Sequence, residues 1–167
     1  QLHKLILTST TYRQALRSDP DQQAIDPDNR LFGGARLRRM EAEVVRDSIL
    51  AVSGAMNSKP FGPPIPVRAD RGGQWVMGIE TQSAGRPGEV IPMNGEEHRR
   101  SIYVQVRRSR PLAVLDTFDA PRMEPLCEAR SSSTVAPQSL MLMNGTFTVA
   151  QSKVFAERLM AEAGNQP

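Results

Sequence analysis

The stretch Arg100-Ser-Ile-Tyr-Val-Gln-Val106 decides the fold class, because it alternates apolar and polar side chains along its length. In an extended chain, Ile102, Val104 and Val106 share one face and Tyr103 points to the other, which is typical of a half-buried β-strand. We therefore expect this strand to belong to a small antiparallel sheet against which helices pack.

Amphipathic helices are predicted before this strand. One runs from the first residue to about Arg17, and a second runs from about Ala35 to Ser53 and ends at Gly54. In the second helix the charged residues, Arg46 among them, lie largely away from the apolar stripe. That stripe comprises Leu37, Met40, Val44, Val45, Ile49 and Val52.

Helices are also predicted after the strand. Pro111 lies in the first turn of a short helix, where its missing N–H is harmless. A longer helix starts at Pro137 and breaks at Asn144-Gly145, and a last helix runs from Thr148 to Ala163. Its predicted buried side comprises Val154, Phe155, Leu159 and Met160. The sequence therefore predicts an α+β fold, mainly α, that ends in a helical hairpin.

A segment rich in glycine and proline separates the second helix from the strand. From Gly54 to Gly95, 14 of 42 residues are Gly or Pro, against 11 of the other 125. Short strands fit at Ile65 to Arg68 and Gln74 to Ile79, with a hairpin turn at Arg71-Gly-Gly73. We interpret residues 54–97 as an insertion, with a flexible loop over 81–97.

The composition fits one domain over residues 1–167, or the C-terminal part of one. Helical periodicity from the first residue indicates a piece of a longer protein. No apolar run approaches the roughly 20 residues of a membrane span. The single cysteine, Cys127, excludes an intrachain disulfide and a multi-cysteine zinc site, and two histidines exclude a three-histidine metal site.

Arginines on both sides of the predicted strand are the candidate anion- or partner-binding residues. They are Arg99, Arg100, Arg107, Arg108 and Arg110. Guanidinium groups bind carboxylate, phosphate or sulfate in a bidentate manner. Adjacent residues of a strand point to opposite faces, so all five cannot meet one ligand, and pairing with nearby carboxylates is the alternative. A net charge of only +3 and the lack of a binding motif argue against nucleic acid.

Two single residues have both a functional and a structural interpretation. Trp75 is a candidate for stacking on a carbohydrate ring, and the alternative is partly buried packing beside Val76 and Met77. Cys127 is a nucleophile only if His98 lies beside it as a base. The alternatives are an inert thiol and a disulfide to a segment outside this chain. The sequence contains no phosphate-binding loop, no dinucleotide-binding glycine motif, no hydrolase elbow and no haem-attachment motif. We therefore assign no catalytic residue, no metal and no cofactor to this chain.

A family resemblance rests on several longer segments. They are Arg99-Arg-Ser-Ile-Tyr-Val-Gln-Val-Arg-Arg-Ser109, Leu115-Asp-Thr-Phe-Asp119, Ser132-Ser-Thr-Val-Ala-Pro-Gln138 and Leu140-Met-Leu-Met-Asn144. These segments resemble a planctomycete-specific C-terminal domain of unknown function, and the chain is similar to the second half of that domain. The resemblance covers nearly the whole chain apart from the loop around residues 81–97.

The resemblance implies a setting for the chain. Members of the family are large exported proteins, so a periplasmic or extracellular location is expected. Upstream they carry a second domain of unknown function and often a cytochrome-c-like domain, so haem c is expected in the parent protein but not here. No catalytic residues are established for the family.

Two hypotheses follow for the function. The first is a non-catalytic structural or binding module tied to redox or polysaccharide handling at the cell envelope. Its partners are the N-terminal domains of the same protein, or an acidic or sulfated polysaccharide. The second is part of an enzyme active site that the N-terminal domains complete, with Arg107, Arg108 or Asp119 contributing.

Overall fold

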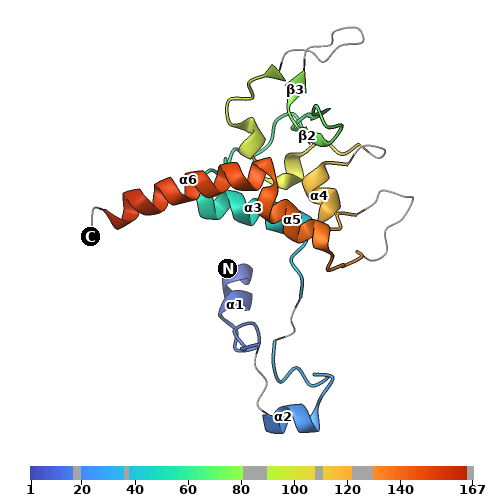
Figure 1. Ribbon diagram of the computed structural model, residues 1–167. Coiled ribbons are helices and arrows are strands. Elements are labelled where there is room, and N and C mark those ends of the chain that lie inside the picture. Colours follow the sequence, from blue (N-terminus) through green and yellow to red (C-terminus); the bar gives the residue numbers. More distant parts are fainter. Residues whose placement is uncertain (17–19, 36–37, 81–89, 108–110, 122–129, 165–167) are drawn as a thin grey trace. The chain divides into compact units, whose positions relative to one another are not determined.

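The protein is described by a computed structural model that covers residues 1–16, 20–35, 38–80, 90–107, 111–121 and 130–164 (Figure 1). The chain divides into two compact units, residues 1–39 and residues 40–167. The described residues are mainly helical and include two small two-stranded antiparallel sheets. The predicted α+β class, mainly α, is therefore confirmed.

The first unit contains two short helices, α1 over Leu2–Thr8 and α2 over Pro20–Ile25. The prediction of one helix from residue 1 to about Arg17 is wrong. Hydroxyl groups end α1 early, because Thr8 Oγ1 donates to Lys4 O at 2.8 Å and Ser9 Oγ donates to Ile6 O at 2.7 Å. Such bonds compete with the helical pattern.

The second unit begins with helix α3, which spans Ala42–Ser53 and ends, as predicted, at Gly54 in a left-handed conformation with φ of 81°. Its start lies several residues later than expected. The expected apolar stripe is also wrong, because Val44 and Val52 are 44% and 53% exposed. The buried face instead comprises Ala42, Arg46, Leu50 and Ser53.

Two hairpins follow α3. Strand β1 (Val67–Ala69) pairs with β2 (Trp75–Met77), and β3 (Ile79–Glu80) pairs with β4 (Val90–Ile91), both antiparallel. The predicted turn between β1 and β2 is confirmed, since Asp70 Oδ1 accepts bonds from the backbone N–H groups of residues 72 and 74 at 2.9 and 2.8 Å. Most of the predicted loop, residues 81–89, lies outside the described residues.

The predicted strand from Arg100 to Val106 is wrong. A short 3₁₀ helix, η1 (Glu96–His98), precedes this segment, and a second one, η2 (Ser101–Tyr103), lies within it. Isolated parallel bridges join Asn57 to Arg99 and Ile65 to Val104. Asp47 of α3 holds Ser101, and the Ile65 backbone pairs with Tyr103 and Gln105 through two hydrogen bonds. Val104 is buried, whereas Ile102 and Val106 are 76% and 64% exposed, so the three do not share a buried face.

The remaining helices are α4 (Ala113–Thr117), α5 (Ala136–Asn144) and α6 (Thr146–Ala163). Helix α6 lies beside α3, and α5 contacts both α4 and α6 (Figure 1). Gly145 joins α5 to α6, so the predicted break is confirmed. An ideal Cβ at Gly145 would lie 2.5 Å from Met141 O, which leaves room only for glycine at this corner.

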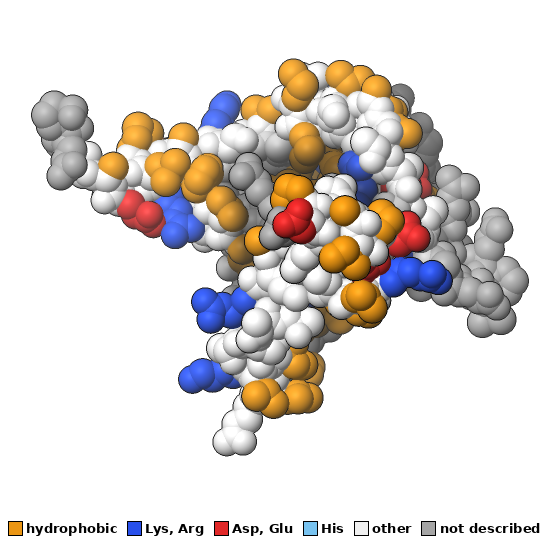
Figure 2. Space-filling view, turned by 90° about the horizontal axis from the view of Figure 1, so that it is seen from below, with side chains coloured by type: hydrophobic (Ala, Val, Ile, Leu, Met, Phe, Trp, Pro, Cys, Tyr) orange, Lys and Arg blue, Asp and Glu red, His pale blue; other side chains and the backbone are white. Residues whose placement is uncertain are grey.

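The apolar core of the second unit is small. It comprises Ile65, Val67, Val104 and Leu112, with Trp75, Met77, Met93, Tyr103, Val114 and Leu115 packed against it. The predicted burial of the last helix is wrong at Val154, Leu159 and Met160, which are 38%, 47% and 67% exposed. The C-terminal turns of α6 extend past the end of the shorter α3, and hydrophobic side chains lie along them at the surface (Figures 1 and 2).

Candidate functional site

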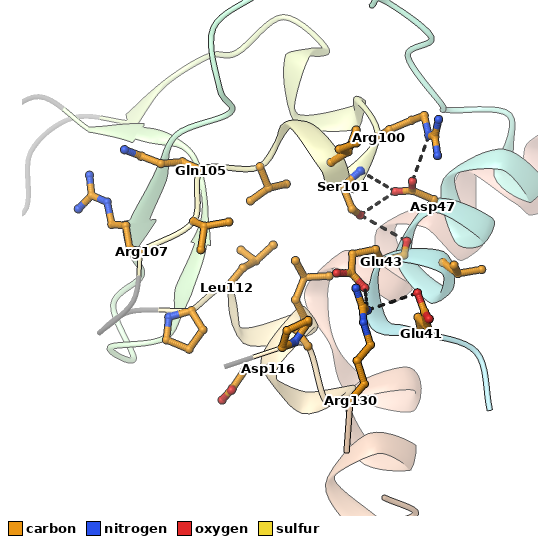
Figure 3. Close-up of a pocket in the computed structure, with 18 residues that line it drawn as sticks. Glu41, Glu43, Asp47, Arg100, Ser101, Gln105, Arg107, Leu112, Asp116 and Arg130 are labelled. Carbon is orange, nitrogen blue, oxygen red and sulfur yellow. Dashed lines mark hydrogen bonds and ion pairs between the residues drawn. The ribbon is translucent and has the colours of Figure 1, made fainter. Parts of the chain in front are cut away.

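A groove of about 1040 Å³ lies within the second unit, between the start of α3, residues 100–107, the region of α4 and Arg130 (Figure 3). Its floor is apolar and includes the buried Val104 and Leu112. Ile102, Val106 and Val44 also line it and keep large exposed fractions of 76%, 64% and 44%. The groove therefore presents apolar surface that the described residues do not cover.

One rim of the groove is an ion-pair cluster. The Arg130 guanidinium Nη1 lies 2.7 Å from Glu43 Oε2 and 3.4 Å from Glu41 Oε2 (Figure 3). All three side chains are about one-third to one-half exposed. Exposed pairs of this kind contribute at most about 1 kcal/mol each, so the cluster sets the charge of the rim more than the stability of the fold.

Asp47 connects the groove to the segment that replaces the predicted strand. Its Oδ1 accepts hydrogen bonds from the Ser101 backbone N–H at 2.8 Å and from Ser101 Oγ at 2.6 Å. Arg100 Nε lies 3.5 Å from Asp47 Oδ2 (Figure 3). These contacts fix residues 100 and 101 against α3, which explains why η2 forms there.

Arg46 lies behind the groove and is fully buried. Its guanidinium donates to Arg99 O at 2.9 Å, to Glu97 O at 2.6 Å and to Ser101 Oγ at 3.1 Å. Burial lowers the pKa of Arg46, and the neighbouring Asp47 opposes that shift. The apolar pattern of the sequence predicts an outer position for Arg46, and no local signal marks it as buried.

The predicted arginines have different surroundings. Arg99 is buried, and its guanidinium donates to the carbonyls of Phe61 and Pro63 and pairs with Glu96 at 3.1 Å. Arg100 is 62% exposed at the groove, and Arg107 also lines it. Arg108 and Arg110 lie outside the described residues. The structure thus brings two of the five, Arg100 and Arg107, to one groove and commits Arg99 to internal contacts.

Trp75 is half-buried against the apolar core, and the Arg107 guanidinium carbon lies 5.6 Å from the centre of its ring. Contacts with the core bury part of the indole ring, and the Arg107 guanidinium lies over one of its faces. The pair Arg107–Trp75 therefore forms a positively charged corner at the edge of the groove.

Of the residues of the enzyme hypothesis, Arg107 lines the groove, Asp119 does not, and Arg108 lies outside the described residues. Asp119 accepts hydrogen bonds from Ser133 N–H at 2.7 Å and from Gln138 Nε2 at 3.4 Å, which positions the start of α5. Cys127 lies outside the described residues, so its contact with His98 is a prediction that stays untested. Within the described ranges, no group of three His, Cys, Asp or Glu residues is arranged to hold a metal ion.

The fold and the groove define a class of protein, a mainly helical α+β module with an apolar groove between charged rims. Within the described part of the chain, no helix is long and apolar enough to cross a bilayer. The model of the PSD1 family, described as a protein of unknown function (DUF1553), matches residues 1–166, and the chain belongs to this family. Searches of the curated proteins and of the solved structures find no match.

Proposed function

We propose that this chain is a non-catalytic structural and binding module whose groove binds polypeptide of the same protein, in the first place its N-terminal domains. The observation that carries the proposal is the exposed apolar lining of the groove, where Ile102 and Val106 are 76% and 64% exposed. Exposed apolar surface framed by polar residues is typical of a protein interaction site.

The charged groups at the groove support binding over catalysis. Glu43 is engaged by Arg130, and Asp47 is engaged by Ser101 and Arg100. A general acid or base needs a carboxyl group that is directed at a substrate. Here Glu43 and Asp47 instead connect parts of the groove wall, as expected for a preorganised binding surface.

The wider setting of the proposal comes from the sequence resemblance. We place the module in a large exported protein of a planctomycete, located in the periplasm or outside the cell. A cytochrome-c-like domain with haem c is proposed upstream, which ties the protein to redox or polysaccharide handling at the cell envelope. Recovery of the parent gene tests this setting directly, since it would lack an export signal and a haem-attachment motif if the proposal were wrong.

The binding proposal is tested with the upstream part of the parent protein expressed as a separate chain. We expect the two chains to associate in isothermal titration calorimetry, and Ile102→Asp or Val106→Asp to weaken that association at least about tenfold. Leu140→Asp is the matched control, because Leu140 is 56% exposed on α5 and does not line the groove. Equal affinities for the control and the groove variants would contradict the proposal.

A second candidate ligand is an acidic or sulfated polysaccharide. The observation that favours it is the exposed Arg100 together with the Arg107–Trp75 corner at the same groove. Binding to heparin at low salt, lost in the double variant Arg107→Ala with Arg108→Ala, is the expected result, and Arg71→Ala is the control. Absence of heparin binding by the wild-type chain would remove this candidate and leave the polypeptide proposal intact.

A further inference from the structure

Residues 104–107 line the groove and run beside the chain at Ile65. Val104 is extended, with φ of −70° and ψ of 132°. On one side of this segment, the Ile65 N–H donates to Tyr103 O at 2.7 Å and the Gln105 N–H donates to Ile65 O at 2.8 Å. These two bonds form the parallel bridge between Ile65 and Val104. On that side, the segment is therefore paired as a β-strand is paired.

The other side of the segment is open. Neighbouring residues of an extended chain direct their backbone groups to opposite sides, so the groups of Val104 and Val106 face away from Ile65. The Val104 N–H turns back to Ser101 O at 3.0 Å. Within the described ranges, Val104 O and the N–H and C=O groups of Val106 make no hydrogen bond. The lining of the groove thus includes the open edge of a strand.

Such an edge is a template for another extended chain, because its unpaired N–H and C=O groups accept a further strand. Here the edge lies beside exposed apolar side chains, those of Ile102 and Val106. A strand that pairs with this edge satisfies the open backbone groups, and every second side chain points onto the apolar surface. A helix bonds its own backbone groups internally, so it would leave the edge unpaired. The backbone of the groove therefore favours an extended ligand over a helical one.

We propose that the groove binds an extended segment from the upstream part of the same protein, by β-strand addition to residues 104–106. The inference rests on the proposed function, because it uses the same polypeptide-binding groove and assigns the conformation and the charges of the segment that occupies it. Main-chain hydrogen bonds to Val104 O and from the Val106 N–H supply affinity, and contacts with the side chains of the groove supply specificity.

Two exposed charged side chains of the groove, Arg107 and Asp116, have no ion-pair partner in the described part of the chain. The other charged groups of the lining pair with one another, namely Arg100 with Asp47 and Arg130 with Glu41 and Glu43. Figure 3 shows the two unpaired groups on different elements, Arg107 on the segment after η2 and Asp116 on α4. Charge complementarity therefore assigns the bound segment an acidic side chain at Arg107 and a basic one at Asp116. Such charges fix the register of the added strand more than they add affinity.

Amide hydrogen exchange, followed by NMR with the upstream part of the parent protein as a separate chain, tests the proposal. In the free chain the Val106 N–H has no acceptor among the described residues, so it should exchange rapidly. Binding should slow this exchange at least about tenfold, because the N–H then donates to the added strand. The Gln105 N–H is the internal control, since it already donates to Ile65 O at 2.8 Å and should change little.

Two substitutions at residue 106 separate the backbone from the side chain. Val106→Pro removes the N–H donor, whereas Val106→Ala shortens the side chain and keeps the donor. In isothermal titration calorimetry, the proline variant should bind the upstream part at least about tenfold more weakly than the alanine variant. Proline requires an extended residue before it, and Gln105 pairs with Ile65 as a strand residue does, so the variant should fold. Circular dichroism checks this, and the exchange measurement on the wild-type chain does not depend on it.

The assigned charges have their own test. Arg107→Glu should weaken binding of the upstream part more than Arg71→Glu does, because it places a carboxylate opposite the acidic side chain of the partner. Arg71 is the matched control, since it is exposed and does not line the groove. Equal affinities of the two variants would overturn the assignment of an acidic side chain to Arg107.

The outcomes separate this inference from the proposed function. Association that leaves the exchange of the Val106 N–H unchanged, or equal affinities of Val106→Pro and Val106→Ala, would overturn strand addition. Either result would leave the proposed function standing, because a helix or a folded surface can occupy the groove without pairing with its edge. Absence of any association between the two chains would overturn the proposed function and this inference together.

Discussion

Replacing Arg46 with methionine tests whether the buried guanidinium organises the second unit. Methionine fills a similar volume on an unbranched chain but cannot donate hydrogen bonds. Arg46→Met therefore leaves the carbonyls of Glu97 and Arg99 without the donors that Arg46 supplies at 2.6 and 2.9 Å. It also removes the donor that Arg46 supplies to Ser101 Oγ at 3.1 Å.

The expected cost is about 2–4 kcal/mol of unfolding free energy. Losing a charged partner costs each buried carbonyl about 1.5–3 kcal/mol. Part of this loss is offset, because the buried charge of Arg46 is itself unfavourable, as the lowered pKa of Arg46 indicates. Single domains are stable by only about 5–15 kcal/mol, so the variant should fold but denature at a clearly lower denaturant concentration.

Denaturant unfolding followed by tryptophan fluorescence measures this cost. Trp75 is the single tryptophan of the chain and packs against the core of the second unit, so its emission reports on that unit. Arg71→Met is the control, since Arg71 is exposed in the β1–β2 turn and its replacement should change stability by less than about 0.5 kcal/mol. If Arg46→Met costs no more than Arg71→Met, the buried guanidinium does not organise the unit.

Three further changes have predicted outcomes. The hydrogen bond from Lys59 lowers the pKa of Glu96 below 4.5, so Glu96 stabilises the fold above its ordinary pKa, and this contribution is lost as the pH falls through the folded-state value. Lys59→Met should therefore raise the pKa of Glu96 in an NMR titration, and an unchanged value would refute the assignment. Phe61→Gly should raise the unfolding free energy by about 0.5–1 kcal/mol, because glycine adopts φ of 60° without strain; a loss of stability by calorimetry would show that the ring is packed. Gly145→Ala should lower the unfolding free energy by about 1–3 kcal/mol, because the added Cβ would lie 2.5 Å from Met141 O; a neutral result in denaturant unfolding would mean that the corner relaxes freely.

Local signals in the sequence determined much of the secondary structure. Gly54 ends α3, Pro137 lies in the first turn of α5, and Arg71-Gly-Gly73 forms the β1–β2 turn. These predictions succeed because the deciding residues are only a few positions from the structure they fix. The family resemblance is likewise a property of the sequence and extends along nearly the whole chain.

The candidate site shows where local patterns were insufficient. The alternation of apolar and polar residues from 100 to 106 predicted a strand. Instead, Asp47, more than fifty positions away in sequence, accepts a hydrogen bond from the Ser101 N–H, and residues 101–103 form η2. Two arginines of the predicted cluster, Arg100 and Arg107, do reach the groove, whereas Arg99 is buried and donates to the backbone carbonyls of Phe61 and Pro63. The groove itself has no counterpart in any single stretch of sequence.

The sequence by itself determined the helical class, the breaks between helices and the chemical types available at the surface. Only the tertiary structure decided which face of α3 is buried and which arginine is structural. The physical reason is that burying a guanidinium group is costly unless hydrogen-bond acceptors surround it. For Arg46 these acceptors are the backbone carbonyls of Glu97 and Arg99, which are distant in sequence. Such partners are brought together by the folded chain and are not visible in its local pattern.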